Sequence, residues 1–194
     1  RYEEHLSYWV SEKDRGQTHA INKGFKRATG VVVNWLNSSY MLPPDSLWRL
    51  AEAIRSNQEA DIYYGDYVAV DEAGEPVYKR KMGPYMHRAL FWGRQLSSQP
   101  AVFIRSSLFE KLGYLDEKKV FGMDTEFWIR VSRAGTTFQQ VKHPLGITRS
   151  HPAAKTTRLQ HVLRDEHKDI VRRYNALGLF KPGSRAENIY FTFM

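Results

Sequence analysis

The chain has 194 residues, which is enough for one domain with a substantial core and too few for two domains of ordinary size. Its 42% hydrophobic and 26% charged residues indicate a globular rather than a disordered protein, and the lack of cysteine excludes disulfides, thiolate metal sites and a cysteine nucleophile. The 29 Lys and Arg residues against 21 Asp and Glu give a net charge of +8, which favours anionic partners.

The first half of the chain alternates helical apolar stripes with β-branched runs, a pattern typical of layered α/β folds. Burial on both faces of the first β-branched run favours a parallel strand. The expected elements are a helix over 20–28, this strand over 31–36, a loop over 37–44, a helix capped by Asp45, a strand over 61–70 and its hairpin partner over 76–80.

The same alternation continues in the second half, where Gly113 and Gly135 are placed to end helices. We expect residues 1–180 to form one domain and residues 181–194 a C-terminal tail. The expected elements are a short helix over 84–92, a strand over 101–104, helices beginning near Ser106 and Asp124, short strands over 137–141 and 147–149, and a long helix over 156–176.

Polar loops follow three of the expected strands. In open parallel sheets, ligands bind in the crevice beyond the carboxyl ends of the strands. That rule nominates residues 37–39, the region of Asp124 and residues 149–151 as parts of one site.

A series of short motifs occurs in a specific order along the chain. They are Ser11–Gly24 with Ala28–Gly30, Val33–Ser38, Leu42–Pro44, Tyr64–Asp66 with Asp71–Gly74, Gln99–Arg105, Phe109–Glu117 with Met123–Arg130, and Arg149–Pro152 with Lys155–Thr156. In this order they resemble the family 2 glycosyltransferases, over roughly residues 8–175.

The resemblance implies the GT-A fold, an α/β architecture in which a Rossmann-like, mostly parallel sheet is flanked by helices. That fold opens with a strand, a loop and a helix that hold the nucleotide base, and this sequence begins after them, so we expect a sheet that is incomplete at the N-terminus. The resemblance also implies inverting transfer of a sugar from a nucleotide-diphosphate donor to a hydroxyl of a glycan or lipid-linked acceptor, in glycan or cell-surface polysaccharide synthesis.

Site residues follow from the same resemblance. It implies that Asp124 is the base that takes the proton from the acceptor hydroxyl, although an acidic residue at a helix start also serves as a cap. It implies that Asp14 and Arg15 line the nucleotide pocket, although both also suit a turn before a helix. The other substrate-binding residues it implies are Asn37, Ser38, Ser39, Gln99, Glu126, His151 and Lys155.

A departing nucleoside diphosphate needs neutralisation, which a divalent metal held on carboxylates usually supplies. The resemblance implies Asn37, Ser39 and His151 as ligands of Mn²⁺ or Mg²⁺. However, Ser39 and Tyr40 stand where the family usually has acidic residues, and His19 stands where it commonly has Asp. Hard cations prefer anionic oxygens, so we expect weak or absent metal dependence, with cationic groups such as His151, Lys155 or Arg149 in the metal's place, or a loss of activity.

Two other functions compete with an active transferase. A non-catalytic relative would keep the fold as a binding or scaffolding module, which the missing acidic residues favour. A nucleic-acid-binding module would suit the charge and aromatic content, but no nucleic-acid motif is found and we expect no such partner. The sequence has no apolar run of the ~20 residues that span a bilayer and no leader at its start, so we expect a cytoplasmic protein that can contact the inner membrane face.

Overall fold

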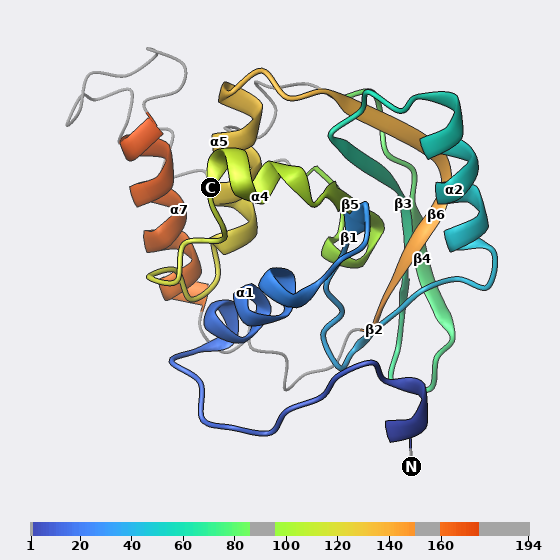
Figure 1. Cartoon of the computed structure of the whole chain (residues 1–194), viewed down its shortest axis with the longest axis horizontal. Coiled ribbons are helices and arrows are strands. Elements are labelled where there is room, and N and C mark those ends of the chain that lie inside the picture. The colour runs from blue at the N-terminus through green and yellow to red at the C-terminus, as the bar shows by residue number, and fades with distance from the viewer. Residues whose placement is uncertain (1, 86–95, 150–159, 175–194) are drawn as a thin grey trace.

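The computed structural model describes residues 2–85, 96–149 and 160–174. They form one mixed sheet with helices on both faces (Figure 1). The helices are η1 (Glu3–His5), α1 (Gln17–Arg27), α2 (Ser46–Ser56), η2 (Gln99–Ala101), α4 (Ser107–Leu112), α5 (Met123–Arg133) and α7 (Gln160–Tyr174). The strands are β1 (Val32–Val33), β2 (Tyr40–Met41), β3 (Ile62–Val70), β4 (Pro76–Arg80), β5 (Val102–Arg105) and β6 (Phe138–Arg149).

The strand order is β1-β5-β3-β6-β2, and β4 pairs with β3 beside this path. The expected α/β class is confirmed, but the expected mostly parallel sheet is wrong for the described strands. Only β3 and β6 run parallel, and the other four pairs, including β1 with β5, are antiparallel. Within this run Val33 is buried, Val32 is half-buried and Val31 is exposed. The β-branched composition indicates a strand, but it does not fix the direction of the neighbouring strand.

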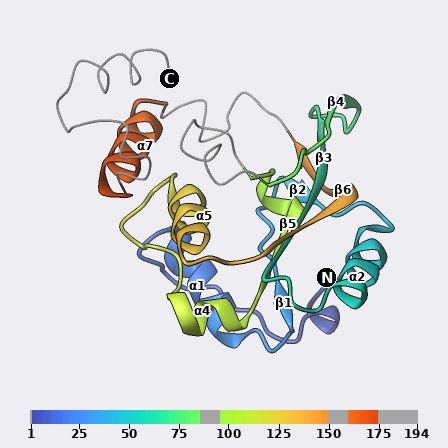
Figure 2. The ribbon, with the colours of Figure 1, turned by 90° about the horizontal axis from the view of Figure 1, so that it is seen from above.

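The core is divided into two clusters by the sheet. Figure 2 shows α1, α4, α5 and α7 on one side and α2 on the other. The larger cluster contains stacked aromatic rings, among them Phe25 against Phe109 at 4.5 Å between centroids and Trp35 against Trp128 at 6.4 Å. Such pairs add to the free energy of burial and fix α1, α4 and α5 against the sheet. The smaller cluster packs Leu50 of α2 over β3, β5 and β6.

Two boundaries differ from the expectation. Residues 40–41, expected in a loop, form β2, a two-residue edge strand whose only signal is its pairing partner on β6. The two expected strands after α5 are one twelve-residue strand, β6. Pro144 lies where the register with β3 shifts, and such an irregularity tolerates a residue without an N–H donor.

Three expectations fall largely outside the described residues: the helix over 84–92, the tail over 181–194 and the domain boundary at 180. The hairpin of β3 and β4 and the helices α2, α4 and α5 lie where expected, within three residues at each end. Among the described residues, no helix combines the length and hydropathy needed to cross a bilayer.

Candidate active site

The turn after β1 carries three of the expected site residues. The Tyr40 N–H donates to the Asn37 carbonyl at 2.9 Å, which closes a turn containing Ser38 and Ser39. Tyr40 then pairs with Thr148 of β6, and the Arg149 N–H donates to the Ser39 carbonyl at 3.0 Å. The turn is therefore fixed beside the carboxyl end of β6.

A cluster of amide side chains, Gln17, Asn37 and Gln99, joins this turn to α1 and η2. The Gln17 Nε2 donates to the Asn37 Oδ1, and the Asn37 Nδ2 donates to the Gln99 Oε1, both at 2.9 Å. Burial raises the pKa of the Tyr40 hydroxyl, and a hydrogen bond from Asn37 opposes that rise. The structure thus brings together the expected residues Asn37 and Gln99, and adds Gln17 and Tyr40.

Close approach of η2 to the sheet depends on Gly146 of β6. A Cβ atom at this position would lie 2.7 Å from the Ala101 nitrogen and 2.7 Å from the Pro100 carbonyl carbon. A Cβ atom essentially never lies this close to a non-bonded heavy atom, so only glycine lets η2 lie here. Gln99, the first residue of η2, is 9% exposed.

Asp124 is the second residue of α5. The Thr18 hydroxyl on α1 contacts the Lys119 carbonyl at 3.0 Å and the Met123 sulfur at 2.8 Å, which holds α1 against the beginning of α5. Burial raises the pKa of Asp124, and hydrogen bonds to its Oδ1 from the Thr125 N–H (2.6 Å) and hydroxyl (3.3 Å) act against that rise. Asp124 as a whole residue is half-buried.

Asp124 and the turn after β1 belong to one electrostatic neighbourhood, because the charge of Asp124 raises the pKa of Tyr40. Helix α1 contacts the turn through Gln17 and contacts Met123, the residue before Asp124, through Thr18. The candidate site therefore combines the amide cluster, Tyr40 and Asp124, contributed by four separate segments of the chain.

Asp14 and Arg15 are engaged in ion pairs. The Lys23 ammonium, 2.6 Å from Asp14 Oδ1, and then the His19 ring, at 2.9 Å, lower the pKa of the Asp14 carboxyl. Arg15 contacts Glu117 at 2.6 Å, and that bond lowers the pKa of Glu117. The described contacts of these two residues are with α1 and the loop after α4 rather than with Asn37 or Asp124.

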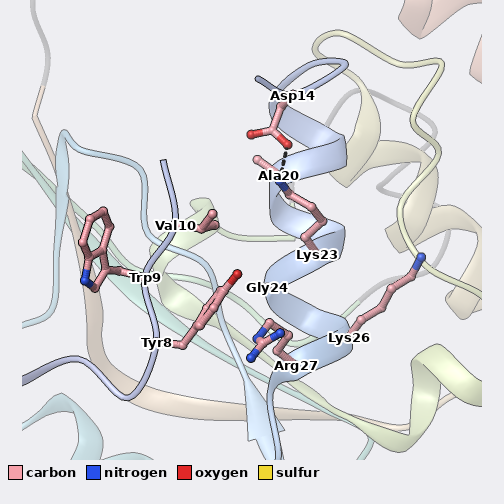
Figure 3. Close-up of a pocket in the computed structure, with 9 residues that line it drawn as sticks. All are labelled: Tyr8, Trp9, Val10, Asp14, Ala20, Lys23, Gly24, Lys26 and Arg27. Atoms are coloured by element: carbon pink, nitrogen blue, oxygen red, sulfur yellow. Dashed lines mark ion pairs between the residues drawn. The ribbon is translucent and has the colours of Figure 1, made fainter. Parts of the chain in front are cut away.

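Asp14 also borders a pocket of about 480 Å³ on the outer face of α1 (Figure 3). The Arg27 guanidinium lies 3.6 Å from the centre of the Tyr8 ring across this space. None of the amide cluster, Tyr40 or Asp124 lines the pocket, so it is separate from the candidate site. Its lining residues are Tyr8, Trp9, Val10, Asp14, Ala20, Lys23, Gly24, Lys26 and Arg27.

Glu126 lies in a different network from Asp124. Two positions along an α-helix are about 200° apart around its axis, so Glu126 points to another side of α5. Its carboxylate, 2% exposed, pairs with Arg130 at 2.9 and 3.0 Å and accepts a hydrogen bond from Tyr174 of α7. This carboxylate anchors α5 to α7, a role that its acidic character in the sequence did not indicate.

The remaining expected residues divide into two groups. Ser38 is exposed and Ser39 half-buried, while His151 and Lys155 lie outside the described residues. No group of three or more His, Cys, Asp or Glu side chains that could hold a metal ion occurs within residues 2–85, 96–149 and 160–174. The turn offers neutral oxygens from Asn37, Ser39 and Tyr40, so the described donor set does not fit a hard divalent cation.

Comparisons with known proteins bear on the family and the fold of the chain. Two curated relatives, both uncharacterized glycosyltransferases from Mycobacterium tuberculosis (strains CDC 1551 and H37Rv), are 28% identical over 132 residues, which cover 66% of this chain and 48% of theirs. The chain thus spans about half the length of these relatives.

Solved structures give the same fold. The crystal structure of S. aureus TarS 1-349 superposes with a TM-score of 0.63 at 16% identity, covering 98% of this chain and 55% of TarS 1-349. The complex of TarS 1-349 with UDP-GlcNAc also gives 0.63, at 14% identity, with coverage of 98% and 64%. This likeness shows the GT-A fold. The model of "Glycosyl transferase family 2" matches residues 1–113, more than half of the sequence, and the chain therefore belongs to that family.

Proposed function

We propose that the protein transfers a sugar from a nucleotide-diphosphate sugar to an acceptor hydroxyl, with inversion at the anomeric carbon. The observation that carries the proposal is Asp124, a half-buried residue whose carboxyl pKa is raised by burial and whose charge acts on Tyr40 at the turn after β1. Family membership supplies the transferase class. The UDP-GlcNAc complex of TarS supports a nucleotide-sugar donor.

In the proposed step, Asp124 takes the proton from the acceptor hydroxyl as that oxygen attacks the anomeric carbon. The bond from this carbon to the diphosphate breaks, and the nucleoside diphosphate leaves with the electron pair. Burial that raises the pKa of Asp124 makes its carboxylate a stronger base than an exposed aspartate.

Donor contacts are proposed for Asn37, Ser38, Ser39 and Gln99 around the turn. Asp14 and Arg15 on the nucleotide side, and His151 and Lys155 beyond β6, remain predictions. Glu126 is not included, because its carboxylate is already committed to Arg130 and Tyr174.

The acceptor is proposed to be a glycan or a lipid-linked glycan at the cytoplasmic face of a membrane. Three consecutive cations, Lys79, Arg80 and Lys81, are exposed at and just after the end of β4, and none has an ion-pair partner among the described residues. Such a surface attracts anionic lipid headgroups, at about 1 kcal/mol per basic residue close to the membrane.

A non-catalytic binding module is the second candidate, and Ser39 and Tyr40 in place of acidic residues favour it.

The two candidates differ in whether the protein turns over a nucleotide sugar. The protein is incubated with a panel of nucleotide sugars and a lipid-linked glycan extract, while nucleoside diphosphate release and the mass of the acceptor are followed. Equal amounts of released diphosphate and transferred sugar support the transferase, whereas nucleotide binding without release supports the second candidate.

The pH dependence of sugar transfer should report the protonation of Asp124. A base works only when deprotonated, and the raised pKa of Asp124 moves the acid limb of kcat/KM above 3.8, the ordinary pKa of an aspartate. Removing the Thr125 hydroxyl in Thr125→Val removes a hydrogen bond that lowers this pKa, so the acid limb should move to still higher pH. A kcat/KM profile measured for both proteins checks the shift, and an acid limb that moves to lower pH in the variant would contradict the assignment.

A further inference from the structure

The turn after β1 carries no negative side chain. Ser39 and Tyr40 occupy the positions where the sequence resemblance calls for acidic residues. Burial raises the pKa of the Tyr40 hydroxyl, so this side chain is a neutral phenol near pH 7. The turn can therefore donate and accept hydrogen bonds but offers no charge to attract a divalent cation.

Asn37 is already committed within the amide cluster. Its oxygen accepts a hydrogen bond from Gln17, and its NH₂ group donates one to Gln99. If Asn37 turned toward a metal ion, the buried Gln99 Oε1 would lose its described donor, and an unpaired buried polar group is unfavourable. The cluster is thus satisfied as it stands.

The carboxylates near the beginning of α1 are also occupied. Asp14 is paired with Lys23 and His19, and Glu117 with Arg15. Asp124 is the carboxylate whose charge acts on Tyr40, and the proposed function uses it as the base. Among the described residues, Asp124 belongs to no group of three or more His, Cys, Asp or Glu side chains that could hold a metal ion.

Arg149 is a cationic residue whose backbone lies directly beside the turn. Its backbone N–H is bonded to the Ser39 carbonyl, and it pairs in the strand register with Val70. Its side chain is exposed and has no ion-pair partner among the described residues. A guanidinium presents five N–H donors in a planar fork that matches two phosphate oxygens, and it stays charged at every physiological pH.

We propose that this site holds the donor's diphosphate without a divalent metal, and that Arg149, beside the neutral turn of Asn37–Tyr40, is a residue that neutralises it. The ligand class is a nucleoside diphosphate, and the inference rests on the proposed function. Arg149 is then both a binding residue and a stabiliser of the charge that develops on the leaving group.

Calorimetric titration of the full chain with UDP, GDP and dTDP, each in EDTA and in MnCl₂, tests the first part. We expect one of these to bind with a Kd that differs by less than about twofold between the two buffers, well below the tenfold that corresponds to about 1.4 kcal/mol. Binding that requires Mn²⁺ would overturn the inference while leaving the nucleotide-sugar proposal intact. Binding of none in either buffer would overturn the proposed function itself.

Substitution of Arg149 tests the second part. Arg149→Met should weaken diphosphate binding in EDTA about tenfold or more, since hydrogen bonds to charged groups contribute about 1.5–3 kcal/mol. Arg55→Met is the matched control, because Arg55 is an exposed arginine at the end of α2, on the other side of the sheet, and its loss should leave the Kd unchanged. A Kd for Arg149→Met equal to that of the unmodified chain would remove Arg149 from the site.

Restoring acidic residues gives the converse test. The double variant Ser39→Asp/Tyr40→Asp should gain Mn²⁺ binding, seen as loss of the free Mn²⁺ signal in electron paramagnetic resonance, and should bind diphosphate more weakly in EDTA. Ser39→Asp alone, at a half-buried position with no described side-chain hydrogen bond, is the companion if the double variant unfolds. Mn²⁺ binding by the unmodified chain as strong as that of the variant would show that the metal site exists without carboxylates and would overturn the inference.

Discussion

Asp124→Asn is expected to lower the turnover of sugar transfer by at least about a hundredfold, and up to about 10⁴-fold, the range that general base catalysis supplies. Asparagine has nearly the same shape and can still accept the hydrogen bond from Thr125. It has no basic group for the proton of the acceptor hydroxyl. Steady-state kcat, measured by nucleoside diphosphate release, checks the prediction.

Thermal unfolding separates this loss from damage to the fold. Because burial raises the pKa of Asp124, its charged form is disfavoured in the folded protein, and a neutral side chain should leave Tm unchanged or raise it. Asp165→Asn, at an exposed position on α7, is the matched control and should change neither kcat nor Tm. A fully active Asp124→Asn protein would exclude Asp124 from the reaction.

Arg130→Met is expected to give the largest loss of stability, about 3–5 kcal/mol of the free energy of unfolding, as when one partner of a buried ion pair is removed. The substitution leaves the buried carboxylate of Glu126 without its counter-charge. It also removes hydrogen bonds from the guanidinium to the carbonyls of Leu112, Gly113 and Tyr114. Urea unfolding followed by circular dichroism measures the change.

The double variant Glu126→Gln/Arg130→Met is the control for this mechanism. Removing both charges leaves no buried ion alone, so the double variant should be more stable than Arg130→Met. If the double variant were no more stable than the single one, the loss would come from the carbonyl contacts rather than from the stranded charge. A loss below about 1 kcal/mol for Arg130→Met, within the range of an exposed ion pair, would show that the pair is not an anchor.

Turn and capping residues in the sequence predicted the ends of helices and of the β3–β4 hairpin, because these ends depend on residues close together in the chain. The turn over 71–74 between β3 and β4 contains Gly74 at φ +92°, and Asp71 accepts hydrogen bonds from the Gly74 and Glu75 N–H groups. Gly113, at φ +83°, ends α4. Pairing between strands that are distant in the chain could not be predicted from the sequence. It determines the direction of β1, the pairing of β2 and the continuity of β6 through Pro144.

Some residues of the candidate site could be nominated from the sequence, and others could not. Asn37, Gln99 and Asp124 could be nominated because each follows or begins an element within a motif. Gln17 could not, since an exposed glutamine at the start of a helix carries no sequence signal until its amide partner is in place. Glu126 was expected among the substrate-binding residues, but the turn of the helix places it in the core, where it pairs with Arg130.

Gly146 constrains which substitutions this protein can accept during evolution. A single methyl group there would push η2 outward, and with it Gln99 and its hydrogen bond from Asn37. With Asn37 and Gln99 as the proposed donor contacts, a substitution at residue 146 would weaken donor binding without itself touching the ligand, and a survey of natural variants restricted to the proposed contacts would miss it.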